Sequence, residues 1–528
     1  MFFYNFKAWY NSQFSFSERY DSMEAIEYAR MSFDSVAFFI FFPITTLGYF
    51  ILPHRFRWLW LLVASCAFYM AFIPSYILIL FATIVVDYIA GLWIEKSVGR
   101  RRKIFLIISL VSNISFLAFF KYYNFTALNF TALAHALHWN YTIPLLKIIL
   151  PIGLSFHTFQ AMSYTIEVYR GHQPAERHFG LYALYVLFYP QLVAGPIERP
   201  QHMLPQFREV HRFDAGKVSA GLRRMLWGFF KKIVVADRLA VIVTTVYGNV
   251  HGYAGIPLVI ATIAFAFQIY GDFSGYSDIA RGSAEVMGFR LMKNFERPYF
   301  SKSIAEFWRR WHISLSSWFR DYVYLPLGGN RVGAWRSAMA IAVVFLLSGL
   351  WHGANWTFVV WGVWHAGCII ISRLTRSLRQ RLVGVLRLDR FPRAHAFLKV
   401  SSTFALVCFG WIWFRAATLS DAWYVTTHLG SGIGQTLGAL FTQGKSMIFA
   451  ETFLGFRLGL DRVEFLIAIM VVAVLLGAEF LIRNPRGWFL EKYQHSVVLR
   501  WSIYYFLLFS ILIFGMYTDT SAFIYFQF

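Results

Sequence analysis

The sequence predicts an all-helical protein that crosses a membrane many times, and three observations carry this prediction. Of the 528 residues, 58% are apolar and 14% are charged, whereas soluble domains carry about 45–50% and about 25%. Aromatic residues make up 20% of the chain. Apolar runs close to the length of a membrane helix, about 20 residues, recur along it. A water-soluble globule could not bury so much apolar surface, and the composition also excludes disorder.

The elements follow in order from these runs. Residues 1–30 are polar and lack the pattern of a signal peptide, so we expect a short N-terminal extension, or a start at Met31, before one membrane domain over 31–528. Some runs are short or broken by Pro and Gly, as in 148–156, which is typical of segments that line a cavity or re-enter. We therefore expect about 10–13 membrane and re-entrant helices. The runs lie at 32–52, 58–73, 76–94, 104–120, 143–163, 179–194, 222–247, 256–270, 338–351, 354–372, 397–416, 463–482 and 498–517.

The charge pattern predicts the orientation in the membrane. The 49 Lys and Arg against 27 Asp and Glu give a net charge of +22, which the preference of basic residues for cytoplasmic loops explains without a nucleic-acid partner. Basic residues follow the first span (Arg55, Arg57) and the third (100–103), so both loops and the arginine-rich 373–393 are expected in the cytoplasm. The segment 199–238 is also basic, although simple alternation places it outside. A re-entrant segment near 179–200 would remove this conflict.

Motifs of soluble enzymes and metal sites are missing from the sequence. Cys66, Cys368 and Cys408 lie in apolar runs without CxxC or metal-ligand spacing, so we expect core residues, no disulfide framework and no metal site. The chain also lacks HExxH, GxSxG, GxxxxGK[ST] and GxGxxG patterns. We expect no bound cofactor.

Four polar stretches interrupt the apolar pattern, at 193–201, 269–282, 307–331 and 348–367. The second stretch carries Asp272 and Asp278 in an apolar context. Ionisable residues at membrane depth are costly, so they are functional candidates by default.

His352 in the fourth stretch is the first catalytic candidate. It stands between Trp351 and Gly353, and we expect the small residues around it, such as Gly349, to let a substrate approach the imidazole. A histidine in an apolar setting stays neutral and can act as a base. The alternative is a buried histidine bonded to a neighbouring helix. If one continuous helix carried both residues, His365 would lie on a different face from His352, so His365 is expected to be structural.

His312 in the third stretch is the second catalytic candidate. It lies among tryptophans and the charged residues Arg309, Arg310, Arg320 and Asp321, a mixture typical of an interfacial or re-entrant helix. The alternative for the arginines is a position at the membrane boundary with no chemical role.

These stretches resemble the membrane-bound O-acyltransferase family and, within it, the branch that O-acetylates alginate. The resemblance covers residues 31–528. The matching segments are MSFDSVAFFIFFP, VAGPIERP, YGDFSGYSDIARGSAEVMGF, NFERPYFSKSIAEFWRRWHISLSSWFRDYVYLPLGGNR, GLWHGANWTFVVWGVWHA and the final FIYFQF.

The resemblance implies a ring of tilted helices around a central tunnel, with a funnel on each face and His352, in LWHG, where the funnels meet. His312, in RWHIS, takes the family's second polar position. His352 would act as general base or carry the acetyl group, and His312 would orient or polarise the thioester. Residues expected to contact substrate are Asn355, Arg309, Arg310, Arg320, Asp321, Asp272 and Trp351.

The resemblance also implies a membrane O-acetyltransferase of the bacterial inner membrane. It would pass acetyl from a cytoplasmic donor, acetyl-CoA, to an extracytoplasmic polysaccharide, alginate or a similar exopolysaccharide. A separate extracytoplasmic acetyltransferase would be its partner, with membrane lipids around the helices. The alternatives are O-acetylation of peptidoglycan or cellulose, and a transporter or scaffold of a polysaccharide complex.

Overall fold

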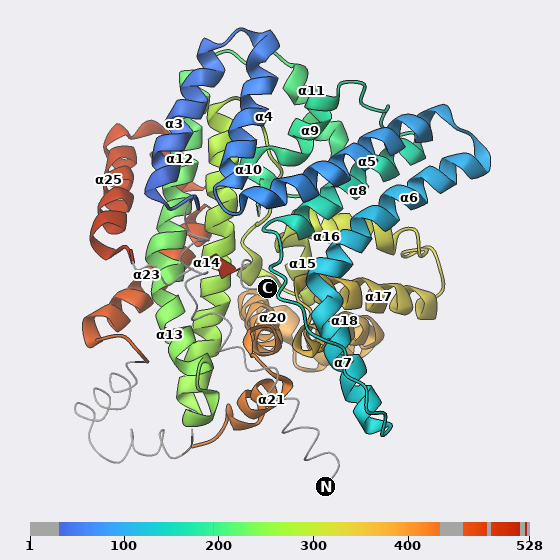
Figure 1. Cartoon of the computed structure of the whole chain (residues 1–528). Coiled ribbons are helices and arrows are strands. Elements are labelled where there is room, and N and C mark those ends of the chain that lie inside the picture. Colours follow the sequence, from blue (N-terminus) through green and yellow to red (C-terminus); the bar gives the residue numbers. More distant parts are fainter. Residues whose placement is uncertain are drawn as a thin grey trace. The chain divides into compact units, whose positions relative to one another are not determined.

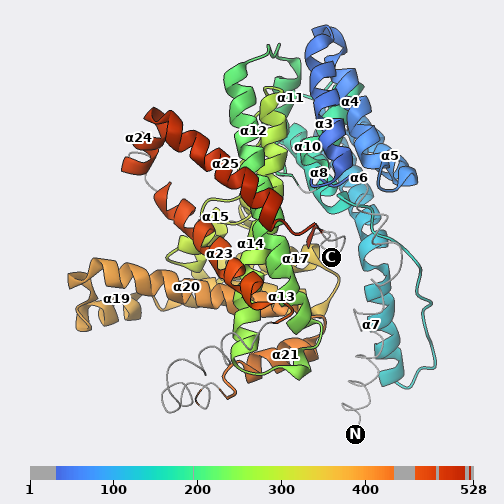
Figure 2. The same cartoon turned by 90° about the vertical axis from the view of Figure 1, so that its left-hand side faces the viewer.

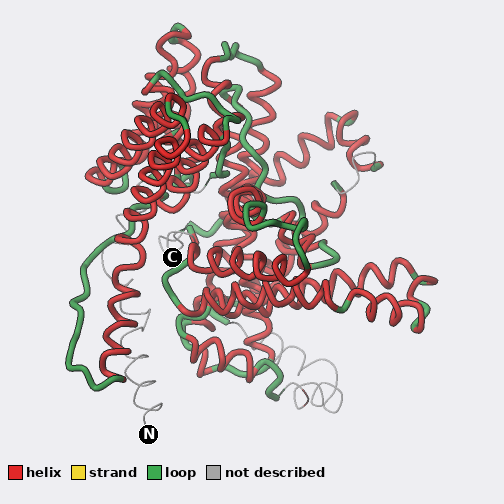
Figure 3. The backbone as a smooth tube through the Cα atoms, turned by 90° about the vertical axis from the view of Figure 1, so that its right-hand side faces the viewer, coloured by secondary structure: helices red, strands yellow, loops and turns green. Residues whose placement is uncertain are grey.

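The computed structural model describes residues 31–193, 195–432, 434, 458–482, 487–517 and 523–524, and over them it contains helices and loops but no strand (Figures 1 and 3). The extension expected over residues 1–30 lies outside this part. Eight described helical segments are long and apolar enough to cross a membrane, and the shorter α3 (Val36–Ile51) is apolar as well. The expected all-helical, multi-pass membrane fold is confirmed. The eight segments are Pro74–Lys96, Gly99–Ala136, Ile256–Val286, Ala334–His352, Trp356–Leu374, Pro392–Arg415, Arg462–Leu481 and Val497–Phe514.

The helices group into two compact units. Among the described residues, the N-terminal unit comprises those in 31–228 and 276–293, and the C-terminal unit comprises those in 229–275 and 294–524. The long helix α14 (Ile256–Val286) contributes residues to both.

The N-terminal unit follows the predicted order of apolar runs. The run expected at 143–163 becomes helical only at Leu154, because Gly153 adopts a left-handed backbone (φ +76°) just after Pro151. Buried polar groups join its helices: Asp87 of α5 accepts hydrogen bonds from Ser109 and Asn113 of α6. Its other helices are α4 (His54–Met70), α5 (Ile77–Lys96), α6 (Gly99–Leu117), α7 (Tyr123–Ala136), α8 (Leu154–Arg170), α9 (Phe179–Leu187), α10 (Tyr189–Leu192), α11 (Pro200–Arg208) and α12 (Ala215–Phe229).

The segment between α8 and α12 turns back within the N-terminal unit, which is the arrangement that the predicted re-entrant segment near 179–200 requires. Helices α9 and α10 have nine and four residues, too few to cross a bilayer. Glu176 before α9 forms a salt bridge with Arg208 at the end of α11, so the chain returns to the end of the unit from which it left. The Arg57 guanidinium donates to the carbonyl of His211, which places the basic stretch after α11 beside the first basic loop.

The C-terminal unit is built around a closely packed helix pair, α17 (Ala334–His352) and α18 (Trp356–Leu374). A Cβ at Gly349 would lie 2.3 Å from the carbonyl oxygen of Phe358, and one at Gly362 would lie 2.4 Å from that of Phe345. Small residues let membrane helices approach at their backbones. The other helices are α13 (Asp237–Tyr247), α15 (Ile304–Arg310), α16 (Ile313–Phe319), α19 (Arg376–Val385), α20 (Pro392–Arg415), α21 (Leu419–His428), α23 (Arg462–Leu481), α24 (Trp488–His495) and α25 (Val497–Phe514).

Three tryptophans form the centre of this unit. Trp311, Trp361 and Trp411 are each at most 1% exposed. The Trp411 ring lies 5.1 Å from Trp311 and 6.3 Å from Trp361 between centroids, so it ties the segment before α16 to α18 and α20. Away from this centre, α19 and the start of α20 form an arm that projects from the unit (Figure 2).

Candidate active site

His352 is the last residue of α17 and is buried, with 4% of its surface exposed. Its ring lies against three aromatic side chains, Trp351 at 4.9 Å, Trp361 at 5.0 Å and Phe414 at 5.2 Å between centroids. The partners come from α17, α18 and α20, so three helices fix the position of the imidazole. The aromatic surroundings also keep bulk water away from it.

The glycines near His352 serve a different purpose from the one expected. A Cβ at Gly353 would lie 2.1 Å from the ring of Phe358, and one at Gly349 would meet the Phe358 backbone. The space beside these glycines is therefore filled by α18. They bring α18 against α17, and the prediction that they make room for a substrate is wrong at these two positions.

His312 lies between α15 and α16, is 1% exposed and adopts a left-handed backbone with φ +44°. Its ring lies 4.6 Å from Phe273 of α14 and 6.1 Å from Trp351. Trp351 therefore touches both histidine rings, and the structure brings His312, Trp351 and His352 into one cluster. Burial lowers the pKa of His312 to about 3, so the ring is neutral at physiological pH.

His365 occupies a neighbouring position on α18 with a structural partner. The Trp308 indole donates to its Nδ1 at 3.3 Å, and its ring lies 5.0 Å from Trp361. Its Nε2 faces Gly410 of α20, where a Cβ would lie 2.8 Å away. These contacts support the expectation that His365 is structural.

A pocket of about 420 Å³ opens beside the histidine cluster. Its wall is mainly apolar but includes three guanidinium groups, Arg309, Arg320 and Arg373, together with Tyr324. Ser348 also lines it and stands four residues, about one helical turn, before His352. The pocket therefore combines an apolar wall with positive charge, and its wall at Ser348 lies about one turn from His352, although neither His312 nor His352 lines it.

The charged residues predicted to contact substrate occupy different places in the structure. Arg309 and Arg320 line the pocket, whereas Arg310 forms a salt bridge with Glu306 at 2.6 Å and is not among the lining residues. Asp321 pairs with Arg320 at 2.8 Å. Arg373 was assigned by the sequence to a basic loop, and its side chain instead donates to Ser337 at the pocket's edge.

Asn355 has a clear local role as the N-cap of α18. Its side-chain oxygen accepts from the Thr357 backbone at 3.1 Å and its amide donates to the carbonyl of Ala417 at 3.1 Å. These contacts hold the turn that follows His352 against the segment after α20. Its predicted contact with substrate stays a prediction.

Asp272 lies on α14 in a buried charged cluster. One carboxylate oxygen is 3.0 Å from Lys232, and the other accepts the backbone N–H of Ile524 at 2.7 Å. Phe523, next to Ile524, packs at 5.9 Å from Phe273, the residue that contacts His312. Asp272 therefore anchors the end of the described chain on the helix that supports His312.

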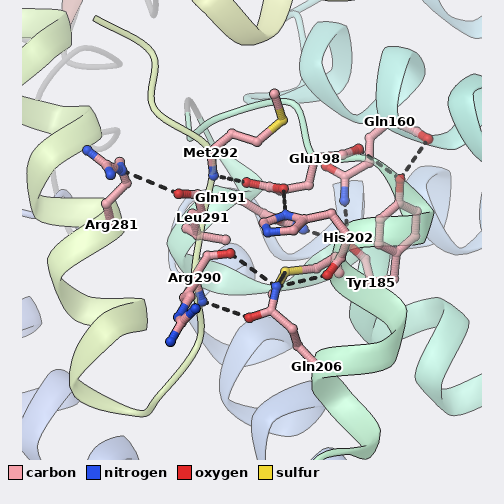
Figure 4. Close-up of polar contacts among 11 residues, drawn as sticks. Gln160, Tyr185, Gln191, Glu198, His202, Gln206, Arg281, Arg290, Leu291 and Met292 are labelled. Carbon is pink, nitrogen blue, oxygen red and sulfur yellow. Dashed lines mark hydrogen bonds and ion pairs between the residues drawn. The ribbon is translucent and has the colours of Figure 1, made fainter. Parts of the chain in front are cut away.

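The polar stretch at 193–201 belongs to the N-terminal unit and holds the chain that follows α14 (Figure 4). Glu198 is fully buried; one of its oxygens accepts the Met292 N–H and the other lies 2.8 Å from His202 Nδ1. Gln206 accepts from the Arg290 N–H at 2.8 Å and donates to its carbonyl at 3.1 Å. The hydrogen bond to Glu198 raises the pKa of His202.

Metal ligation has no candidate in the described part of the chain, where no group of three His, Cys, Asp or Glu side chains is placed to hold an ion. Two residues near the site were not among the predicted ones: Phe273, which contacts the His312 ring, and Arg373, which lines the pocket. The position of Phe273 beside Asp272 in the second polar stretch is a signal that could have indicated it.

The chain matches one family model and is similar to several named proteins. Residues 170–387 match the sequence model of the MBOAT, membrane-bound O-acyltransferase family. The probable alginate O-acetylase AlgI of Azotobacter vinelandii is 39% identical over 397 residues, 74% of this chain and 77% of that protein. The peptidoglycan O-acetyltransferase of Helicobacter pylori is 34% identical over 416 residues, which cover 73% of this chain and 76% of that protein. The teichoic acid D-alanyltransferase of Streptococcus thermophilus is 29% identical over 234 residues, which cover 42% of this chain and 56% of that protein.

Proposed function

Because the chain belongs to the membrane-bound O-acyltransferase family, we propose that this acyltransferase takes an acetyl group from cytoplasmic acetyl-CoA for O-acetylation of alginate or a similar exopolysaccharide. The probable alginate O-acetylases of two species, Azotobacter vinelandii and Pseudomonas aeruginosa, each share 39% identity with it over 397 residues. The activity that their names state supports an acetyl group as the group transferred and a polysaccharide as the acceptor.

The observation that carries the proposal is the cluster of His312, Trp351 and His352, one helical turn from the wall of an arginine-containing pocket. Acetyl transfer to a hydroxyl needs a base for its proton and a donor group for the charge that develops on the carbonyl oxygen. His352 supplies the first function and His312 the second.

The reaction balances with these groups. The acceptor hydroxyl attacks the thioester carbonyl, a C–O bond forms as the C–S bond breaks, and His352 passes the hydroxyl proton to the leaving thiolate. In a two-step form, the neutral His352 imidazole first takes the acetyl group and releases the thiolate, and the hydroxyl then displaces the imidazole. Trapping of an acetylated His352 would distinguish the second form from the first.

The pocket suits an acyl-CoA donor. Guanidinium groups recognise phosphate through charge-assisted, bidentate hydrogen bonds, and Arg309, Arg320 and Arg373 supply three of them. The apolar wall suits the pantetheine arm. The arginine-rich segment from 373 to 393 marks the cytoplasmic face, which is where acetyl-CoA arrives.

We place the enzyme in the bacterial inner membrane beside an extracytoplasmic acetyltransferase that completes the modification of the polymer. Support comes from the eight membrane-length helices and from the family, which make the chain a multi-pass membrane protein. The polymer acceptor would approach from the side opposite the basic loops.

Peptidoglycan is the second candidate acceptor. The peptidoglycan O-acetyltransferase of Helicobacter pylori is 34% identical over 416 residues and matches a similar share of the chain. Acetyl analysis of both polymers in a deletion strain decides between the two. Loss of acetyl from the exopolysaccharide alone supports the main proposal, and loss from peptidoglycan alone supports the second. Full acetylation of both polymers in the deletion strain would refute both proposals.

A further inference from the structure

His312 needs external support for its backbone. It is a non-glycine residue with left-handed φ and ψ of +44° and +55°, a conformation that persists only when the surroundings enforce it. It is also the N-cap of α16, a position whose own side chain usually accepts an N–H of the first turn. The His312 side chain makes no such capping hydrogen bond.

A residue from a distant segment caps α16 instead. The carbonyl oxygen of Asn294 accepts the N–H of Ile313 at 2.9 Å, and its side-chain oxygen accepts the N–H of Ser314 at 3.3 Å. These are the first two N–H groups after His312, which a helix leaves without intrahelical partners. Asn294 therefore performs the capping that His312 does not.

The segment 294–296 also bonds the backbone just before His312. The N–H of Glu296 donates to the carbonyl of Arg310 at 2.9 Å, so segment 294–296 is bonded on both sides of 311–312. Between these bonds, the Phe295 ring packs 5.0 Å from Trp311 and 5.0 Å from Phe273. Phe273 in turn contacts the His312 ring.

Asn294 is almost fully buried, at 1% exposure, and belongs to the same unit as His312. Among the described residues its Nδ2 has no hydrogen-bond partner. A buried amide with one unsatisfied end is costly, so the hydrogen bond that the other end makes to α16 must offset that cost, and an apolar residue could not make it.

We propose that Asn294 is a positioning residue for acyl transfer: it caps α16 in place of His312 and so holds the imidazole against Trp351 and beside His352. The inference rests on the proposed function, because it assigns a support to the same site. Asn294 acts through His312 and need not touch the substrate.

The test compares Asn294→Ala, Asn294→Asp and the control Ser496→Ala in membrane vesicles that carry the full chain and its native partners, with labelled acetyl-CoA as donor. Ser496 caps α25 of the same unit by accepting the Leu499 N–H at 3.2 Å, so its loss removes an equivalent cap from a helix that makes none of the contacts described for His312 and His352. Asp keeps the side-chain acceptor that Ala removes. The measurements are kcat, KM for acetyl-CoA, and the thermal midpoint.

Asn294→Ala should lower kcat by about tenfold to a hundredfold with little change in KM, because a small displacement of a catalytic group is enough for such a loss. Asn294→Asp should recover most of kcat, and Ser496→Ala should lower the thermal midpoint while leaving kcat near wild type. If Asn294→Ala fails to reach the membrane, Asn294→Asp carries the test: near-wild-type kcat supports the proposal.

Two results would overturn it: a kcat for Asn294→Ala no lower than that for Ser496→Ala, or a folded Asn294→Asp that recovers nothing. The variant His352→Ala, measured in parallel, separates this failure from failure of the proposed function. If His352→Ala still transfers acetyl, the site itself is wrong. If His352→Ala is inactive while Asn294→Ala is fully active, only the positioning role is wrong.

Discussion

A methyl group added at Gly349 tests why glycines surround His352. In an exposed helix, Gly→Ala stabilises by roughly 0.5–1 kcal/mol because alanine loses less backbone entropy. At Gly349 the new Cβ would lie 2.3 Å from the Phe358 carbonyl oxygen, whereas ordinary contact begins at 3.4 Å, so α18 must retreat by 3.4 − 2.3 = 1.1 Å. Overpacking of this kind costs typically about 1–3 kcal/mol, which outweighs the gain. Gly349→Ala should therefore destabilise the protein.

The matched control is Gly367→Ala on α18, where nothing lies within 4 Å of the added Cβ. The assay is the thermal midpoint of the full chain in one detergent, together with kcat and KM. Gly349→Ala should lower the midpoint and kcat, because the shift moves Trp361 away from His352, while Gly367→Ala leaves both unchanged or raises the midpoint. An unchanged midpoint with a raised KM in Gly349→Ala would refute the packing role and restore the idea that this glycine makes room for substrate.

The remaining predictions concern the pocket and a histidine pair. Arg320→Gln or Arg373→Gln should each raise KM for acetyl-CoA by about tenfold, since a hydrogen bond to a charged group contributes about 1.5–3 kcal/mol. The exposed Arg381→Gln on α19 should not, and unchanged KM in both pocket variants would exclude the pocket as the donor site. Glu198 raises the pKa of His202 from its ordinary 6.5, so the stability that protonated His202 contributes is full below that value and is lost as the pH rises through the raised pKa. From pH 6.5 upward, the thermal midpoint of the wild-type protein should fall as the pH rises, and that of His202→Gln should fall less steeply. Equal slopes for the two proteins would contradict the pairing of His202 with Glu198.

Much of the fold follows from the sequence because apolar runs of membrane length have few other uses. The runs at 338–351 and 354–372 form α17 and α18. The charge conflict around 199–238 predicts a re-entrant segment, and the short helices α9 and α10 lie where it is expected. The run at 143–163 shows the limit. Its apolar composition predicts helix, but the left-handed Gly153 delays the helix to Leu154.

The proximity of two candidate residues was predictable from residue chemistry alone. His312 and His352 stand out as ionisable residues in apolar surroundings, and the structure places both against Trp351, while their catalytic roles stay predictions. The bond from Asn355 to Ala417 and the position of Arg373 depend on tertiary contacts that no local pattern encodes. Asn355 caps a helix and bonds the Ala417 carbonyl, and Arg373 turns from the end of α18 into the pocket wall.

Acetyl transfer by His352→Ala is the most direct test of the central claim that this histidine carries the chemistry. The variant is compared with His495→Ala, an exposed histidine at the end of α24, in vesicles with equal amounts of folded chain and labelled acetyl-CoA as donor. Loss of transfer to the polymer in His352→Ala, with His495→Ala at the wild-type rate, is the predicted result. Transfer by His352→Ala at the wild-type rate would contradict the account.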